Sequence, residues 1–328
     1  MKNLSFLMSR LGKAVFVVLG VVIVNFLLIR LAPGDPASVM AGESGSSDPA
    51  YVDQLRHEFG LDKPVWMQLA IYLRGVLRLD LGFSYRERLP VFDLILDRLP
   101  ATLLLMGCAF VFSIVLGVLV GVVASRAKYR GRFPALDSLL MTVSLLIYAT
   151  PQFWLALLAI IFFSLQLGWL PPFGMETVGA NLTGLSHVRD VAVHLILPTL
   201  SLGCFFMAVY ARLTRASMLE VLGMDFIKTA RAKGVPVGEI VRHHALRNAL
   251  LPVVTFAGIQ LGQMAGGAVL TETVFGWPGI GRLLFDALMQ RDYQLLLGVF
   301  LVTSTLVVVF NLLTDLAYRF IDPRIGDA

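Results

Sequence analysis

The sequence predicts an all-α polytopic membrane protein with six transmembrane helices and a small helical subdomain outside the membrane. Its composition gives the first support, because 57% of the 328 residues are hydrophobic and only 15% are charged. The mean hydropathy is +0.78. Soluble globular chains carry about 25% charged residues. Apolar runs of about 20 residues, the length that crosses a bilayer, then recur along the chain.

The first apolar run, residues 11–31, follows a basic segment that contains Lys2, Arg10 and Lys13. A cleaved signal peptide is the alternative, but the run is too long for one and no good cleavage pattern follows it. Residues 1–31 are therefore predicted to form the N-terminus and an uncleaved first helix. Five further spans are predicted at 100–125, 136–167, 194–211, 250–269 and 295–320, within a transmembrane core at 99–320 that precedes a tail at 321–328.

Residues 32–98 form the longest stretch outside the membrane. Asp48 and Pro49 have the pattern of a helix N-cap followed by proline in the first turn. Apolar residues then recur at helical spacing, which predicts a helical subdomain on the outer membrane surface.

Small residues and one proline predict how the spans pack. Pro151 interrupts the third span and predicts a kink, because proline removes a backbone hydrogen bond. Glycines four residues apart allow helix backbones to approach closely. This spacing occurs at Gly117 and Gly121 in the second span, and at Gly258, Gly262 and Gly266 in the fifth.

Cations in the short loops predict the orientation, because cytoplasmic loops are enriched in lysine and arginine. The segment 126–134 holds Arg126, Lys128, Arg130 and Arg132 and no acidic residue. The insert at 212–249 is also rich in cations. Both termini, the 126–134 loop and the 212–249 insert are therefore predicted to be cytoplasmic, and 32–98 to face outward.

No catalytic or metal site is predicted. The chain has no G-x-x-x-x-G-K-[ST] run, so any ATP that it uses must be hydrolysed by another chain. His243 and His244 are adjacent and lack partners at metal-ligand spacing. His194 is the only histidine near the interior of a span, and no G-x-S-x-G run provides a nucleophile. The basic clusters are explained by membrane orientation, so no nucleic acid partner is expected.

Uncharged polar residues lie inside the predicted spans, whereas charged residues at mid-depth are almost absent. An ion-coupled pump would need buried charges. The polar residues either form hydrogen bonds between helices or line a hydrated path for a polar solute. They are Gln152 beside the kink, and Thr255, Gln260 and Gln263 in the fifth span.

The segment from Glu220 to Pro252 is a polar, basic insert between two apolar spans. Its apolar residues recur at helical intervals, and Gly234 and Pro236 divide it into two short amphipathic helices, 220–233 and about 236–248. Such helices either lie flat on a membrane surface or insert into a groove on a partner. The cations of the insert are Lys228, Arg231, Lys233, Arg242 and Arg247.

The stretches TARAKG (229–234) and HALRNALLP (244–252) resemble the cytoplasmic loop of ABC-importer permeases of the dipeptide, oligopeptide and nickel class. The resemblance covers essentially the whole chain in the expected order. The other matching stretches are LAPGDP (31–36), LDLGFS (79–84), FGWPGIGRLLFDAL (275–288), RDY (291–293) and DPR (322–324).

This resemblance implies the type I importer permease fold in a bacterial inner membrane. It also implies a second homologous permease, two ABC ATPase subunits that bind ATP and Mg, and an extracytoplasmic substrate-binding protein. The implied function is alternating access for di- or oligopeptides or related small solutes. A stand-alone channel or secondary transporter is the alternative, which internal repeats or buried ion-coupling carboxylates would favour.

The resemblance also implies site residues. The general family pattern E-A-A-x-x-x-G appears here with Lys228, Thr229 and Ala230 in its first three positions and Gly234 retained, and Pro252 comes later than usual. The register of the docking helix is open between the segments before and after Gly234, and the one before is favoured. Trp277, Pro278 and Gly279 are expected to contact the binding protein, and the translocation path is expected at Pro151, Gln152, Thr255, Gln260 and Gln263. The predicted ATPase-coupling residues are Glu220, Asp225, Phe226, Thr229, Ala230, Arg231, Ala232, Lys233, Gly234, His244, Arg247, Asn248 and Pro252.

Overall fold

The computed structural model describes residues 2–31, 48–58, 60–84, 86–131 and 133–321. The chain divides into two compact units. Unit 1 comprises Met1–Pro100 and Gly279–Leu312, and unit 2 comprises Ala101–Pro278 and Leu313–Ala328. The DPR stretch and most of LAPGDP lie outside the described residues.

Unit 1 surrounds an apolar core that includes Val22, Leu81, Val91, Ile280 and Leu295. The predicted helix after Asp48 is confirmed, and Ala50 N–H donates to Asp48 Oδ1 at 3.0 Å, as an N-cap requires. The elements are α1 (Lys2–Leu31), α3 (Pro49–Glu58), α4 (Val65–Leu77), β1 (Phe83–Ser84), β2 (Leu89–Pro90), residues 91–100 of α5 (Val91–Arg130), α12 (Ile280–Met289) and residues 293–312 of α13 (Tyr293–Ile321).

A short antiparallel hairpin, β1–β2, was not predicted. It pairs Phe83 with Pro90 and Ser84 with Leu89. The buried Ser84 hydroxyl donates to Asp292 Oδ2 at 2.5 Å, and the other oxygen, Oδ1, accepts the Leu295 N–H at 3.1 Å in the first turn of α13. The LDLGFS and RDY stretches are therefore joined by one carboxylate that also caps a helix.

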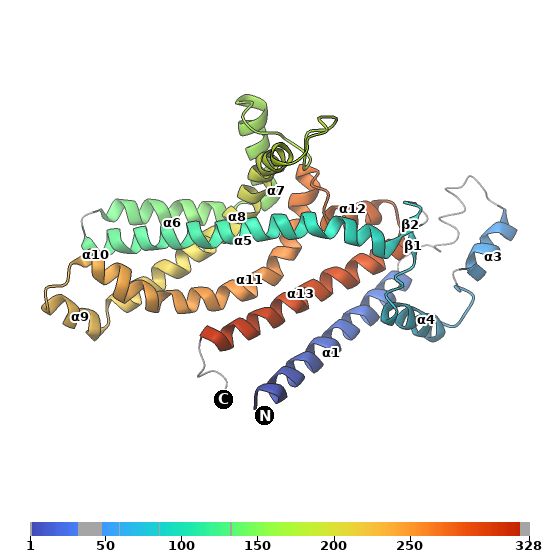
Figure 1. Ribbon diagram of the computed structural model, residues 1–328, viewed down its shortest axis with the longest axis horizontal. Helices are drawn as coiled ribbons and strands as arrows, with labels where there is room; N and C mark the ends of the chain where they lie inside the picture. Colours follow the sequence, from blue (N-terminus) through green and yellow to red (C-terminus); the bar gives the residue numbers. More distant parts are fainter. Residues whose placement is uncertain (1, 32–47, 59, 85, 132, 322–328) are drawn as a thin grey trace. The chain divides into compact units, whose positions relative to one another are not determined.

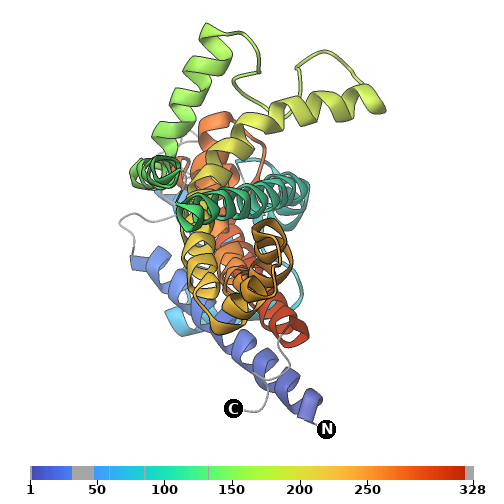
Figure 2. The same ribbon diagram turned by 90° about the vertical axis from the view of Figure 1, so that its left-hand side faces the viewer.

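Unit 2 is a helical bundle in which α8 packs against both α6 and α11 (Figures 1 and 2). Its elements are residues 101–130 of α5, α6 (Pro134–Ala149), α7 (Gln152–Ala159), the π-helix η1 (Ile160–Gln166), α8 (Leu185–Leu222), α9 (Asp225–Ala232), α10 (Val237–Glu239), the π-helix η2 (Ile240–Ala245), α11 (Leu246–Phe275) and residues 313–321 of α13.

Within the described residues, five helices are long and apolar enough to cross a membrane, and a bent pair makes a sixth candidate. The pair is α6 and α7–η1, which meet at 104° (Figure 2). Pro151 was predicted to kink one continuous span, but the break is sharper. Proline disfavours a helical conformation in the residue before it, and Thr150 accordingly has a ψ of 133° and ends α6. Pro151 itself has a ψ of 132° and is the N-cap of α7.

The predicted glycine contacts are confirmed in α5. A Cβ at Gly117 would lie 2.8 Å from the Met207 carbonyl oxygen, and one at Gly121 would lie 2.6 Å from the Ala211 carbonyl oxygen, so only glycine permits this approach to α8. The prediction for α11 holds in part. A Cβ at Gly258 would collide with Thr314, whereas Gly266 has nothing within 4 Å.

Candidate functional site

The segment 223–245, called the α8–α11 connection, contains the short helix α9. The helix ends at Ala232 with Lys233 as its C-cap, and the next residue is Gly234, whose φ is +79°. The Val235 N–H donates to the Ala230 carbonyl at 3.2 Å, and the Gly234 N–H donates to the Arg231 carbonyl at 2.9 Å. This pair of hydrogen bonds is a Schellman motif, which fixes where α9 stops and how the chain turns back.

One face of α9 is buried against the helices that flank it. Ile227 is 1% exposed and Ala230 is 9% exposed. They pack with Met218 near the end of α8 and with Ile240 and Val241 of η2. Because this cluster is apolar, burial of hydrophobic surface, rather than directional hydrogen bonds, holds α9 against α8 and η2.

The opposite face of α9 is exposed. Met224 and Phe226, both large and apolar, are each 42% exposed. Exposed apolar side chains flanked by charge are typical of surfaces that bind another protein. The exposed predicted coupling residues of this connection are Asp225, Phe226, Thr229, Arg231, Ala232, Lys233 and Gly234.

Two cations on α9 have defined contacts. Lys228 Nζ lies 2.8 Å from Asp225 Oδ1, one turn earlier on the same exposed face. The Arg231 guanidinium lies 4.8 Å from the centre of the Tyr129 ring, which belongs to the end of α5. The cation–π contact therefore fixes one edge of α9 to a third helix.

The two predicted short helices differ from the observed ones. Glu220 does not begin a helix, because α8 continues to Leu222 and the chain turns at Gly223 and Met224 before α9. The second segment does not end near Asn248, because η2 runs directly into α11, which also contains Pro252. No residue between Ile240 and Asn248 breaks a helix, and Gly223 was the overlooked stop signal.

The remaining predicted coupling residues lie on η2 and the first turns of α11. His244 is half-buried, whereas Arg247, Asn248 and Pro252 are exposed. Asn248 Nδ2 donates to the His244 carbonyl at 2.8 Å, a hydrogen bond within the helix. These residues therefore flank α9 without forming part of its exposed face.

Trp277 lies at the other end of α11 and is 0% exposed. Its indole Nε1–H donates to the Ala101 carbonyl of α5 at 2.9 Å. This burial counts against the predicted contact of Trp277 with a binding protein, because a fully enclosed side chain presents no surface. Gly279 is buried as well, and Pro278 is half-buried.

A buried carboxylate near Trp277 was missed by the sequence analysis. Glu272 is 0% exposed, and its Oε1 accepts the Thr102 hydroxyl of α5 at 2.7 Å. Glu272 lies just beyond the predicted end of the fifth span, so it did not count as an intramembrane charge. Its position in α11, between Thr271 and the helix end, shows that this helix extends further than its apolar run.

The predicted translocation-path residues separate into two groups. Gln152 Nε2 donates to Thr271 Oγ1 at 2.8 Å, and Gln260 is 3% exposed, so both lie in helix contacts. Thr255 and Gln263 are exposed on the opposite side of α11. Pro151 is exposed at the bend between α6 and α7.

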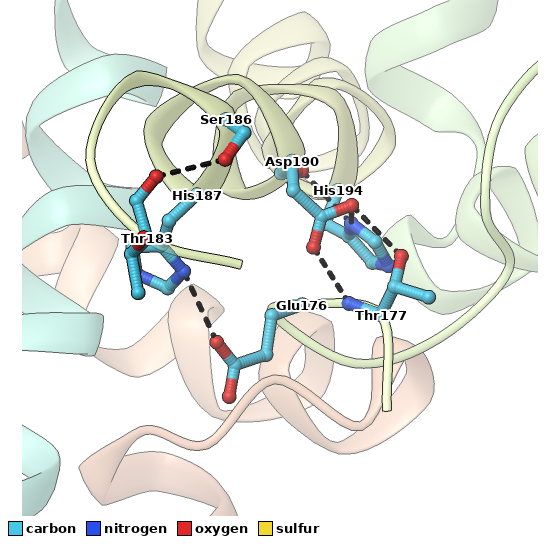
Figure 3. Close-up of polar contacts among 7 residues, drawn as sticks. All are labelled: Glu176, Thr177, Thr183, Ser186, His187, Asp190 and His194. Atoms are coloured by element: carbon cyan, nitrogen blue, oxygen red, sulfur yellow. Dashed lines mark hydrogen bonds and ion pairs between the residues drawn. The ribbon is translucent and has the colours of Figure 1, made fainter. Parts of the chain in front are cut away.

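A polar cluster joins the loop 167–184 to the start of α8 (Figure 3). The Asp190 carboxylate accepts the Thr177 N–H at 2.6 Å and the Thr177 hydroxyl at 2.8 Å. His187 Nδ1 lies 3.3 Å from Glu176 Oε2, and His194 Nδ1 lies 2.9 Å from the Asp190 carbonyl oxygen. Asp190 therefore anchors the loop to α8, and His194 contacts Asp190 one turn earlier on its own helix.

In the part of the chain that the structure describes, no three His, Cys, Asp or Glu side chains lie close enough together to share an ion.

Comparison with known proteins identifies the class. A family model described as "Binding-protein-dependent transport system inner membrane component" matches residues 113–327, and the model of its N-terminal part matches residues 3–106. The chain is 41% identical over 339 residues to the dipeptide transport system permease protein DppB of Escherichia coli K12, with 98% of each chain covered. It is 42% identical over 336 residues to the di/tripeptide transport system permease protein DppB of Pseudomonas aeruginosa, again with 98% of each covered.

Solved structures agree on the fold. The MetNI methionine ABC transporter, in an inward-facing conformation, matches with a TM-score of 0.56 and 20% identity, over 70% of this chain and 96% of that one. An amino acid ABC transporter matches with a TM-score of 0.51 and 16% identity, over 70% and 94% of the two chains. The protein is thus a polytopic transport subunit with the type I importer permease fold. The chain belongs to the family of binding-protein-dependent transport system inner membrane components, the permease subunits of ABC importers.

Proposed function

We propose that this chain forms half of a translocation path for di- or oligopeptides or related small solutes. A second homologous permease forms the other half, and an extracytoplasmic binding protein delivers the solute. The peptide cargo is supported by relatives that cover 98% of the chain and carry dipeptide and di/tripeptide transport in their names.

The observation that carries the mechanism is the exposed face of α9. Met224 and Phe226 project apolar surface from a helix whose other face is locked onto α8 and η2. Such a helix is suited to a cleft on one of two partner ATPases, which bind ATP and Mg, while this chain remains non-catalytic. Movement of α9 is transmitted to α11 because α9 packs against η2, which runs directly into α11.

The proposed orientation places α9 and both termini in the cytoplasm. It follows the cations of the 126–134 loop and of the α8–α11 connection. Residues 32–98, of which 48–58, 60–84 and 86–98 are described, then face the extracytoplasmic side between a first helix within 1–31 and a permease core at 99–320. Of the tail at 321–328, only Ile321 is among the described residues.

For the path itself, the proposal selects Thr255 and Gln263. They lie about two helical turns apart on the exposed side of α11, with Ile259 between them and Gly266 about one turn beyond Gln263. Gln152 instead joins α7 to α11 through a hydrogen bond, a common role of buried polar residues in membrane helices, and Gln260 is buried among the helices.

The direct test is purification of the chain with its genomic neighbours, followed by uptake of labelled dipeptides into proteoliposomes. We expect a stable complex with two P-loop ATPases and uptake that requires ATP and the binding protein. ATP-independent uptake by this chain alone would support a channel or secondary transporter and contradict the proposal.

Gly234→Pro tests the coupling assignment. Proline cannot adopt φ of +79° and lacks the N–H that bonds to Arg231, so the turn after α9 must change. We expect normal membrane insertion and ATP hydrolysis uncoupled from uptake. Gly179→Pro is the matched control, because Gly179 also has a positive φ of +80° and open space at its Cβ, but lies in the loop 167–184. Unchanged uptake in the Gly234 variant would contradict the assignment.

A further inference from the structure

Arg212 on α8 is the feature of the molecule that the proposed mechanism leaves unexplained. Eight side-chain atoms in the described residues are buried polar atoms without a hydrogen-bond partner, and Arg212 Nε is the one that belongs to a charged group. The others are amide or hydroxyl oxygens. A buried donor that belongs to a charged group costs more free energy to leave unpartnered than a neutral hydroxyl does, so this position requires a physical explanation.

The next arginine along α8 provides an internal comparison. Arg215 lies about one turn further along and is neutralised by Asp137 of α6 through two hydrogen bonds, Nε to Oδ1 at 2.5 Å and Nη2 to Oδ2 at 2.7 Å. Within the described residues, no acidic oxygen lies within 4 Å of Arg212. Two arginines on the same helix thus face the same neighbour, and only one of them has its counter-charge.

The Arg212 side chain extends toward α6. Its guanidinium carbon lies 4.6 Å from the centre of the Tyr148 ring, which stacks on Phe205. Tyr148 lies about 16 Å further along α6 than Asp137, at 1.5 Å per residue. Side chains in a helix lean toward its N-terminus, so Arg212 extends from the level of the ion pair toward the middle of α8.

This direction excludes a simple interfacial role. An arginine near the end of a membrane helix usually extends its charge toward the nearer surface. Arg212 extends the opposite way, over an aromatic face that attracts a cation but carries no negative charge. Tyr148 is 41% exposed and Arg212 is half-buried, so an anion can reach the guanidinium from the exposed side of α6 and α8.

We propose that Arg212, held over Tyr148, binds the carboxylate of the solute as it crosses the permease. The proposal rests on the proposed function, because it takes the solute to be a peptide. A linear peptide with a free C-terminus carries a carboxylate there, whatever its side chains are. A guanidinium matches that group with two parallel N–H donors, which a lysine cannot reproduce. The contact therefore recognises peptides as a class and does not discriminate between their side chains.

The test compares a dipeptide with its C-terminal amide in proteoliposomes that contain the full transporter and saturating binding protein. We expect Arg212→Gln to lower uptake of the free acid by about tenfold, the effect of losing a charge-assisted hydrogen bond, and to leave uptake of the amide unchanged. Arg212→Lys should give an intermediate loss. Arg189→Gln removes one charge from an exposed position on the same helix and should alter neither substrate.

Three outcomes would overturn the assignment. Equal loss for acid and amide would give Arg212 a structural role. Loss that appears only in anionic lipid would mean that the bound oxyanion is a lipid phosphate, and reduced recovery of the assembled complex would mean that the second permease supplies the counter-charge. Wild-type complexes that transport no peptide would contradict the proposed function and this assignment together, whereas wild-type uptake without the selective loss contradicts the assignment alone.

The Tyr148 ring provides a second measurement. Tyr148→Phe keeps the aromatic face and should retain the preference of Arg212 for the acid, whereas Tyr148→Leu removes the face that positions the guanidinium. We expect the leucine variant to lose part of the acid-over-amide preference with assembly intact. The same preference in both variants would contradict the positioning role of Tyr148.

Discussion

The two ends of α11 are held in different ways. At the Trp277 end, directional hydrogen bonds join α11 to other helices: Trp277 to Ala101 at 2.9 Å and Thr102 to Glu272 at 2.7 Å. At the α9 end, the side-chain hydrogen bonds found in the described residues join positions three or four apart on one helix. There the long-range contacts are an apolar cluster and one cation–π pair.

This difference indicates how one helix can be fixed at one end and movable at the other. Hydrogen bonds have strict geometry, so a helix end that they hold cannot shift without breaking them. Apolar contacts are non-directional and tolerate sliding or repacking. We infer that the Trp277 end of α11 is the fixed point, and that the α9 end is the part that moves when a partner binds. The predictions below test each end in turn.

The largest effect is expected at the fixed end. Trp277→Ala removes a fully buried indole and leaves a cavity, which should lower the free energy of unfolding by about 3–5 kcal/mol. Thermal unfolding of the purified complex measures this loss of stability. Trp277→Phe retains most of the volume and loses the hydrogen bond, so it should cost about 1 kcal/mol. Similar midpoints for the alanine variant and the wild type would show that this end is not an anchor.

Ile227→Ala tests the seat of α9. The side chain is 1% exposed, and its truncation should cost about 2–4 kcal/mol of local stability. The apolar cluster around Ile227 is confined to the α9 end. We therefore expect faster amide hydrogen exchange in residues 223–245 and unchanged exchange near Trp277. Exchange that rises equally at both ends would contradict the separation between them.

A smaller effect is expected for Thr271→Val, which removes the acceptor of the Gln152 hydrogen bond and should cost about 1 kcal/mol. Thr273→Val is the matched control, since the Thr273 hydroxyl bonds only to the Val269 carbonyl of its own helix among the hydrogen bonds described. Equal thermal unfolding midpoints for the two variants would show that the Gln152 hydrogen bond does not stabilise the Trp277 end of α11.

Lys228→Ala should have the smallest effect. Lys228 and Asp225 are 71% and 94% exposed, and ion pairs at the surface contribute little to stability. We expect no measurable change in the unfolding midpoint of the isolated permease. A large fall in that midpoint would show that polar contacts do stabilise α9.

The sequence predicted the class and the long apolar helices because hydrophobic burial in a membrane needs only length and composition. It also located Gly117 and Gly121, whose role depends on the absence of a side chain. It did not find the Glu272 contact or the Asp137–Arg215 pair, because each joins residues from different helices and no local pattern links them.

The helix boundaries around Gly234 show a second limit. A stop signal can be recognised, but whether a helix then merges with its neighbour depends on packing. The continuous η2–α11 segment arises because Ile240, Val241 and Ala245 are all buried against α9 and α8. Trp277 was predicted to contact a binding protein, but its side chain is fully buried and its indole donates to the Ala101 carbonyl of α5.

The central claim is that the exposed face of α9 contacts a partner ATPase. Cysteine cross-linking tests it most directly, with Phe226→Cys on the exposed face and Ile227→Cys on the buried face of the same helix, after Cys108 and Cys204 have been replaced by serine. The account predicts cross-links from position 226 to the ATPase and none from position 227. Cross-linking from 227 alone, or from neither position in a complex active in transport, would contradict it.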